Sequence, residues 1–187
     1  MKTQKVLSPA AGISHELYHR VLAKIDECLV ISFGEDEYLL AKYRKEVKVE
    51  FSSKLGVTAG YATYKTKLIE LNTFLFLENI EEFINGTTPH EVAHLVVNEL
   101  YPKAKQTHGP EFRLVMETYG ADPKTYHSYN TDSVRKPKKL FVYTCACDGN
   151  LFKLSTRLHN SIEGSKQIRV CRACRTQLEF TGESIFM

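Results

Sequence analysis

Apolar residues near the start of the chain recur at intervals of three or four, the spacing of one face of an α-helix. Behind Ser14 they are Leu17, Val21, Leu22, Ile25 and Leu29. Serine is a favoured N-cap residue, so the pattern predicts an amphipathic helix over about residues 15–30. A second, more charged helix is expected over residues 36–45.

The period changes to two after residue 46. Val47, Val49 and Phe51 alternate with charged residues, and two further strand-like runs, residues 60–64 and 67–71, are separated by a short turn. Alternation of this kind is typical of half-buried strands. These runs therefore predict a small antiparallel sheet.

Three more helices are predicted between residues 74 and 120. The first covers residues 74–84 and ends at Asn85-Gly86. The second has Thr88 as its N-cap and Pro89 at its first helical position, and it ends near residue 101 because a proline follows. The third begins at Gly109-Pro110 and ends at residue 120.

A proline-broken basic segment, residues 135–139, marks a domain boundary. Beyond it lie four strand-like runs, at residues 140–143, 151–154, 167–170 and 177–180. The predicted fold class is therefore α+β, with a first domain over residues 1–134. Residues 135–187 would form a basic linker and a small β module.

Composition excludes several classes of protein. Of the 187 residues 43% are hydrophobic and 25% charged, as in ordinary globular proteins. No stretch approaches the roughly 18 apolar residues of a membrane span, and the first residues contain no apolar segment of a signal peptide. We therefore expect a cytoplasmic protein with no membrane partner.

The formal charge of +3 is unevenly distributed. From residue 135 onward ten Lys and Arg stand against four Asp and Glu, a formal +6, whereas the first 134 residues carry −3. Such a basic C-terminal segment favours a polyanionic partner such as nucleic acid.

The pentad His90-Glu91-Val92-Ala93-His94 has the pattern HExxH at the start of a predicted helix. Residues four apart share one helical face, so both imidazoles can bind one ion, and Glu91 can take a proton from metal-bound water. The structural alternative is a capping box, in which Glu91 satisfies a backbone N–H beside Thr88. Imidazoles on an otherwise apolar helix need partners, which favours the metal.

A catalytic zinc ion has three protein ligands and a water, so a third ligand is needed. Val97 and Leu100 stand where a metzincin would have glycine and histidine, which excludes that class. The remaining candidates are His108, Glu111 and Glu117. His108 is favoured because it lies in a loop before a helix, from which it can fold back onto the ion.

Four of the five cysteines form two close pairs, Cys145 with Cys147 and Cys171 with Cys174. The pairs enclose strand-like runs, which is the layout of a Cys₄ zinc ribbon, and so small a module needs a structural metal. A redox dithiol and an empty site are the alternatives. His159 could replace one cysteine, but four thiols complete a tetrahedron, so we expect it to be exposed. Cys28 stands apart and is expected to be a core thiol.

Basic residues alternate with apolar ones between the cysteine pairs. Lys153, Arg157 and Arg172 could contact phosphates, and Phe152 could stack on a base, which would favour single-stranded DNA. The alternative is a solvated basic surface.

A polar aromatic cluster, Tyr126, His127 and Tyr129, follows the helix that is predicted to end at residue 120. It could line the active-site cleft or simply form a loop packed on the core.

Three features together resemble the SprT-like (Spartan-like) zinc metallopeptidases, in particular the bacterial type with a C-terminal zinc ribbon. They are the pentad at residues 90–94, the His-Gly-Pro-Glu-Phe run at residues 108–112, and the basic segment with its CxC and CxxC pairs. The resemblance implies a minigluzincin-like domain that holds a catalytic zinc ion by His90, His94 and His108. Glu91 would then be the general base that assists attack of zinc-bound water on a peptide bond. With a structural zinc ion on the four cysteines, the chain would hold two Zn²⁺.

Eukaryotic members of that family degrade proteins crosslinked to DNA. The resemblance therefore implies a metalloprotease whose substrates are DNA-associated or DNA-crosslinked proteins, with the ribbon as its docking module. The alternative from another class is a non-catalytic DNA-binding or adaptor protein in which the first metal is structural. Water at the fourth coordination position would indicate the enzyme, and a fourth protein ligand the scaffold.

Overall fold

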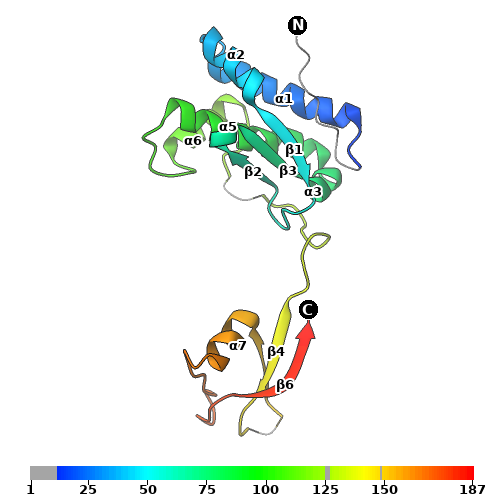
Figure 1. Cartoon of the computed structure of the whole chain (residues 1–187), viewed down its shortest axis with the longest axis vertical. Coiled ribbons are helices and arrows are strands. Elements are labelled where there is room, and N and C mark those ends of the chain that lie inside the picture. Colours follow the sequence, from blue (N-terminus) through cyan, green and yellow to red (C-terminus); the bar gives the residue numbers. More distant parts are fainter. Residues whose placement is uncertain (1–11, 125–126, 148) are drawn as a thin grey trace. The chain divides into compact units, whose positions relative to one another are not determined.

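The computed structural model describes residues 12–124, 127–147 and 149–187 (Figure 1). The chain divides into two units, the first ending at Arg135 and the second beginning at Lys136. The sequence placed this boundary one residue earlier. Each unit has its own three-stranded sheet and its own apolar cluster.

Two capped helices open the first unit. They are α1 (His15–Phe33) and α2 (Glu37–Glu46). The backbone N–H of Leu17 donates to the Ser14 hydroxyl at 3.2 Å, and that of Leu39 donates to the Asp36 carboxylate at 2.9 Å. Both predicted helices are confirmed, and α1 continues three residues further than predicted.

The sheet of the first unit comprises β1 (Lys48–Ser52), β2 (Gly60–Thr63) and β3 (Leu68–Asn72), in the order β1-β3-β2. β2 pairs with β3 in antiparallel fashion, as predicted, but β1 runs parallel to β3. The prediction of a purely antiparallel sheet is therefore wrong. The period-two pattern identifies strands but does not show which strands pair in the sheet. Here β3 lies between β1 and β2, the two strands that precede it in the chain.

The helical segment after the sheet is broken differently from the prediction. α3 (Thr73–Glu78) and α4 (Ile80–Glu82) are followed by a π-helical turn (Phe83–Thr87) that leads directly into α5 (Thr88–Leu100). Asn85-Gly86 therefore does not end a helix. Thr88 is not an N-cap either, because the chain enters α5 from residues that are already helical.

Helix α5 lies at the centre of the first unit, where it contacts α1, β2 and α6 (Pro110–Thr118) (Figure 1). Its apolar face, which includes Val92 and Val96, is fully buried. Cys28 of α1 belongs to the same core at 2% exposure, as predicted, and burial raises the pKa of its thiol to about 12. No helix among the described residues is long and apolar enough to cross a membrane.

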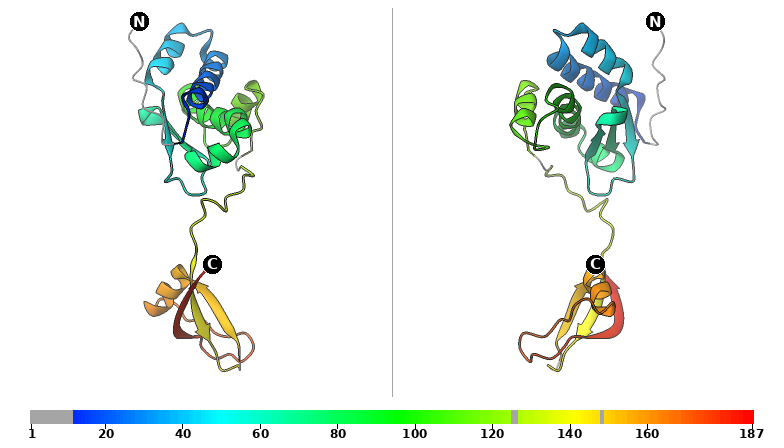
Figure 2. Two further views of the ribbon diagram at one scale, coloured as in Figure 1. Left: turned by 90° about the vertical axis from the view of Figure 1, so that its right-hand side faces the viewer. Right: turned by 60° about the vertical axis from the view of Figure 1, so that its left-hand side comes forward.

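The second unit comprises β4 (Lys139–Thr144), β5 (Leu151–Ser155), α7 (Thr156–Glu163) and β6 (Glu179–Phe186). The strands form an antiparallel sheet in the order β5-β4-β6, and α7 packs against β4 and β5 (Figure 2). The runs at residues 140–143 and 151–154 are strands, as predicted. The run at 167–170 retains a single bridge, between Val170 and Gln177, so a strand there was a wrong prediction, and the run at 177–180 overlaps only the start of β6.

Helix α7 was not predicted at all. Its local signals are visible in retrospect, since the Leu158 N–H donates to the Ser155 hydroxyl at 3.4 Å and Ile162 follows Leu158 by one turn. The helix is only eight residues long and so gives little periodicity.

Candidate metal centres

Helix α5 and the loop before α6 bring three imidazoles together. His90 and His94 are one turn apart, and their Nε2 atoms are 3.2 Å from each other. The Nε2 atom of His108 lies 3.2 Å from that of His90. The loop reaches this position through a turn in which the Gly109 N–H donates to the Gln106 carbonyl at 3.2 Å, just before Pro110 starts α6.

The spacing of these nitrogens matches one tetrahedral ion. Zinc binds imidazole nitrogen at about 2.0–2.1 Å, so two such ligands are separated by roughly 3.4 Å. Burial, together with the neighbouring imidazoles, lowers the pKa of His94 to about 3 and that of His90 to about 4. The rings are therefore neutral, the form that binds metal. The donor set fits zinc, and neither Glu111 nor Glu117 belongs to it.

Phe112 forms an apolar wall beside the three histidines. It is fully buried, and its ring centroid lies 4.8 Å from the centroids of His90, His94 and His108. It fixes the orientation of the imidazoles by packing rather than by hydrogen bonds.

Glu91 lies next to this group but outside it. Its side chain is 5% exposed, and within the described part of the chain it has no hydrogen-bond partner. Burial raises the pKa of its carboxyl to about 8. Its Cγ and Oε1 atoms pack against Gly60 at the start of β2, where an added Cβ atom would be only 2.8 Å from each.

The capping box between Thr88 and Glu91 is absent. Thr88 Oγ1 is buried and has no hydrogen-bond partner among the residues that the structure describes, and Thr88 itself is inside the helix. Glu91 is therefore not engaged at the helix start, and its carboxyl remains available as a proton acceptor.

The second candidate centre lies in the second unit, where four thiols converge. The sulfurs of Cys145, Cys147, Cys171 and Cys174 all lie within 4.8 Å of one another, and those of Cys147 and Cys171 are 4.0 Å apart. Tetrahedral zinc with Zn–S bonds of about 2.3 Å separates sulfurs by roughly 3.8 Å. All four are free thiols, so the group fits a metal and not a disulfide.

Thr176 supports this group from outside. Its hydroxyl accepts from the Ala146 N–H at 3.1 Å and lies 2.9 Å from the Cys174 sulfur. The hydrogen bonds from the Thr176 side chain and backbone lower the pKa of Cys174 to about 6. They favour the thiolate, which is the ligand form.

His159 takes no part in the thiol group, and the expectation that it is exposed was wrong. Its ring stacks on Phe141 at 3.6 Å, and its Nδ1 atom is 3.0 Å from the Tyr143 hydroxyl. His159 therefore helps to build the small core of the second unit.

The three cations predicted to contact DNA do not share one face. Lys153, Arg157 and Arg172 are all exposed. Lys153 lies between Phe152 and Leu154 on β5, so its side chain points to the opposite face, where it is 3.9 Å from the Met187 sulfur. Arg172 is on the face of Phe152, which is itself half-buried.

The polar aromatic cluster packs as a loop. His127 Nε2 lies 2.9 Å from the Val57 carbonyl oxygen, and Tyr129 stacks on Phe83 with its hydroxyl 3.0 Å from that of Thr87. Tyr126 lies outside the described residues. These contacts agree with the alternative of a loop packed on the core.

The first centre defines a class, since three convergent histidines beside a buried glutamate form a candidate metalloenzyme site. Residues 30–132 match the model of the SprT-like family. A protein named Protein SprT from Actinobacillus succinogenes is 38% identical over 66% of this chain and 71% of its own length. Its counterpart from Pseudomonas syringae pv. tomato is 30% identical over 90% of this chain and 98% of its own length. The one from Vibrio atlanticus is 34% identical over 88% and 93% respectively. The chain belongs to the SprT-like family.

Proposed function

We propose that the chain is a zinc-dependent metalloprotease with a minigluzincin-like first domain. The observation that carries the proposal is the geometry of the first centre, in which His90, His94 and His108 fit one ion and the carboxyl of Glu91 beside them has no partner among the described residues. Zn²⁺ bound there would act as a Lewis acid and lower the pKa of a bound water toward about 7.

The residues of the chain perform the proton transfers. Glu91 accepts a proton from the attacking water at a carboxylate oxygen and passes it to the nitrogen of the leaving amine. Burial raises the pKa of the Glu91 carboxyl, whereas Zn²⁺ bound beside it would lower that pKa and favour the carboxylate. Together these two effects prepare the group to accept a proton near neutral pH. Phe112 keeps one side of the site free of water.

In this proposal the chain holds two Zn²⁺ with separate roles. The four cysteines hold the second ion, which is structural. The buried part of the second unit is small, so the metal stabilises what the apolar cluster alone cannot. The free thiols accord with a reducing cytoplasmic location.

The proposed substrates are DNA-associated or DNA-crosslinked proteins, and the basic second unit is the docking module. The formal +6 of residues 135–187 supports this, with Lys153, Arg157 and Arg172 as candidate phosphate contacts and single-stranded DNA as the favoured form. Lys153 and Arg172 lie on different faces, so the cations would hold the backbone of a flexible strand rather than read a duplex.

The rival is a non-catalytic adaptor with a structural first metal. A scaffold site would be closed by a fourth protein ligand, and no fourth His, Cys, Asp or Glu among the described residues joins the three histidines. This observation favours the enzyme.

Metal analysis and a cleavage assay together test the proposal. Wild type and Glu91→Gln are compared on casein and on a protein crosslinked to single-stranded DNA. Glu91→Gln is expected to keep the first zinc ion and to lose activity by on the order of 10² to 10⁴. Equal zinc loss in Glu91→Gln and His94→Ala would make Glu91 a ligand, and absence of cleavage by the zinc-loaded wild type would favour the adaptor.

A further inference from the structure

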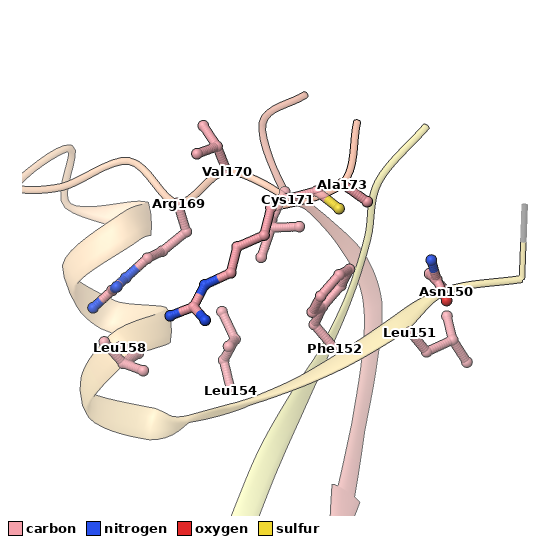
Figure 3. A pocket seen from close by; sticks show the side chains of 11 residues that line it. Asn150, Leu151, Phe152, Leu154, Leu158, Arg169, Val170, Cys171 and Ala173 are labelled. Atoms are coloured by element: carbon pink, nitrogen blue, oxygen red, sulfur yellow. The ribbon is translucent and has the colours of Figure 1, made fainter. Parts of the chain in front are cut away.

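The second unit has a groove on the side where α7 and the cysteine loops meet. Its volume is about 490 Å³, within the range of pockets that bind small groups. Three segments form it: the start and middle of β5, helix α7, and residues 169–173 together with Leu178 (Figure 3).

The walls of the groove are mainly aliphatic. The aliphatic side chains are Leu151, Leu154, Leu158, Val170, Ala173 and Leu178, and the only ring among the lining residues is that of Phe152. Leu151 is 64% exposed and Val170 is 52% exposed. A partner that covered these two side chains would remove their apolar surface from water.

Two guanidinium groups, those of Arg169 and Arg172, also line the groove, and Asn150 and Cys171 are the remaining lining residues. Arg169 extends along the α7 side of the groove (Figure 3). Neither makes an ion pair or side-chain hydrogen bond with any described residue. Unpaired arginines beside an apolar surface are complementary to carboxylates, which they bind in bidentate fashion.

These groups suit a peptide better than a nucleic acid. Proteins that bind single-stranded DNA hold the bases by stacking them on flat aromatic side chains. Leucine and valine side chains do not offer such a face. Aliphatic walls instead accept leucine- or phenylalanine-type side chains. We propose that the groove binds a partner protein through a segment in which such side chains stand next to Asp or Glu. The inference goes beyond the proposed function, because it requires neither catalysis nor DNA, and it assigns Arg172 to a carboxylate of the partner in place of a DNA phosphate.

Selection from a random peptide library displayed on phage tests this chemistry. The zinc-loaded full chain is the bait, and a chain with Arg169→Glu and Arg172→Glu is the comparison. Wild type is expected to enrich peptides that combine acidic residues with leucine or phenylalanine, and the double variant is expected not to. No enrichment, or enrichment of basic peptides, would overturn the proposal.

The best selected peptide is then synthesised with a fluorescent label for anisotropy titrations. Arg169→Glu with Arg172→Glu, and separately Leu151→Lys, are each expected to weaken its binding at least about tenfold. The matched control reverses two exposed cations outside the lining, Lys166→Glu with Arg175→Glu, and should change affinity less than about threefold at fixed salt. Zinc content verifies that each variant is folded. Equal weakening in the control, or displacement of the peptide by oligothymidine at the same site, would refute a peptide groove.

A second inference follows independently from the contact between Gly60 and Glu91. With no hydrogen bond to a described residue, the buried carboxyl of Glu91 is held by packing alone. An added Cβ at residue 60 would be 2.8 Å from Glu91 Cγ and Oε1 and 3.0 Å from Cδ. We infer that Gly60 is a positioning residue for the proposed general base, an inference that rests on the proposed function.

The side chain of Glu91, not the strand, would move in response to a substitution. Gly60 is paired with Leu71 in the sheet, and Leu71 is fully buried. The glutamate side chain is flexible by comparison. The Glu91 atoms would have to move by roughly 0.6 Å or more before their separation from the added Cβ reached an ordinary contact distance. A misplacement of about 1 Å of a reacting group costs about 10- to 100-fold in rate.

Gly60→Ala is therefore expected to retain both zinc ions and its folding, while kcat falls about 10- to 100-fold and KM stays nearly constant. Gly86→Ala is the matched control, since a Cβ there has no atom within 4 Å. In the Glu91→Gln background Gly60→Ala should cause no further loss, because the base through which it acts is already gone. An equal loss in both backgrounds, or activity like that of Gly86→Ala, would refute positioning. If wild type itself shows no cleavage, the proposed function fails instead.

Discussion

Glu99 anchors the C-terminal end of the helix that carries His90 and His94, and its removal should destabilise the first unit. Its carboxylate accepts hydrogen bonds from Lys42 Nζ at 3.0 Å, Tyr43 OH at 2.9 Å and Tyr64 OH at 2.9 Å. The Lys67 ammonium, 3.5 Å away, is itself buried. These partners come from α2, from the 3₁₀ turn (Tyr64–Thr66) and from the residue after it.

The magnitude follows from the pKa of Glu99. Although burial opposes ionisation, the hydrogen bonds from Lys42, Tyr43 and Tyr64 lower this pKa from 4.5 to about 2. A difference of that size corresponds to about 3 kcal/mol of stability at neutral pH. Because the folded-state pKa is depressed, the contribution is fully present above about pH 5 and disappears as the pH falls from there toward 2. Glu99→Gln also leaves the buried Lys67 without its counter-charge, so the expected loss at pH 7 is about 2–4 kcal/mol.

Urea unfolding followed by far-ultraviolet circular dichroism measures this loss. Wild type and Glu99→Gln are compared from pH 7 to pH 3 in the presence of a chelator, so that zinc release at low pH does not contribute. The exposed Glu35→Gln is the control and should change stability by less than about 0.5 kcal/mol. A Glu99→Gln protein as stable as wild type at pH 7 would refute the reasoning, as would a deficit that does not shrink toward pH 3.

Three further predictions concern the metals and the partner. His94→Ala should remove one zinc ion and leave the cysteine site loaded, whereas Cys171→Ser should release the other and unfold mainly the second unit; one equivalent of zinc in reconstituted wild type would contradict both. His108→Ala should lower the zinc affinity of the first site in a competition titration with a zinc chelator, while Glu111→Gln should not. The reverse result would identify Glu111 instead of His108 as the third ligand. Deletion of residues 135–187 should abolish binding of single-stranded DNA, and the affinity of the intact chain should fall with salt at a log–log slope of about −0.7 per phosphate contact; binding insensitive to salt would exclude phosphate docking.

Local signals account for what could be predicted correctly. Ser14 and Asp36 cap helices through atoms three residues away, and the spacing of His90 and His94 places both on one turn of any helix. The cysteine pairs could be recognised for the same reason, because each knuckle is only a few residues long. The third histidine lies beyond such a range, and His108 was favoured because a coordination position needed a ligand, because its loop can fold back onto the ion, and because the family resemblance implies it.

The wrong predictions depended on structure that the local sequence pattern does not specify. Thr88 has the sequence context of an N-cap, but the π-helical turn before it supplies helical geometry that no local rule anticipates. His159 was expected to be exposed because four thiols complete the zinc site without it, but it lies on α7 and stacks on Phe141 of β4. The parallel pairing of β1 with β3 depends on which strand inserts between which, and that is decided by how the whole sheet packs on α5.

The sequence by itself determined most of the helices, the short spacings of His90 with His94 and of the cysteine pairs, and the uneven charge, because residue type and short spacing are sufficient for each. Tertiary structure alone decided that Glu91 lies against Gly60, that Glu99 collects partners from three segments, and that Lys153 and Arg172 occupy different faces. The physical reason is that these features are contacts between segments tens of residues apart. Such contacts arise when apolar surfaces pack together, and the hydrophobic pattern specifies that packing without specifying which side chains will meet.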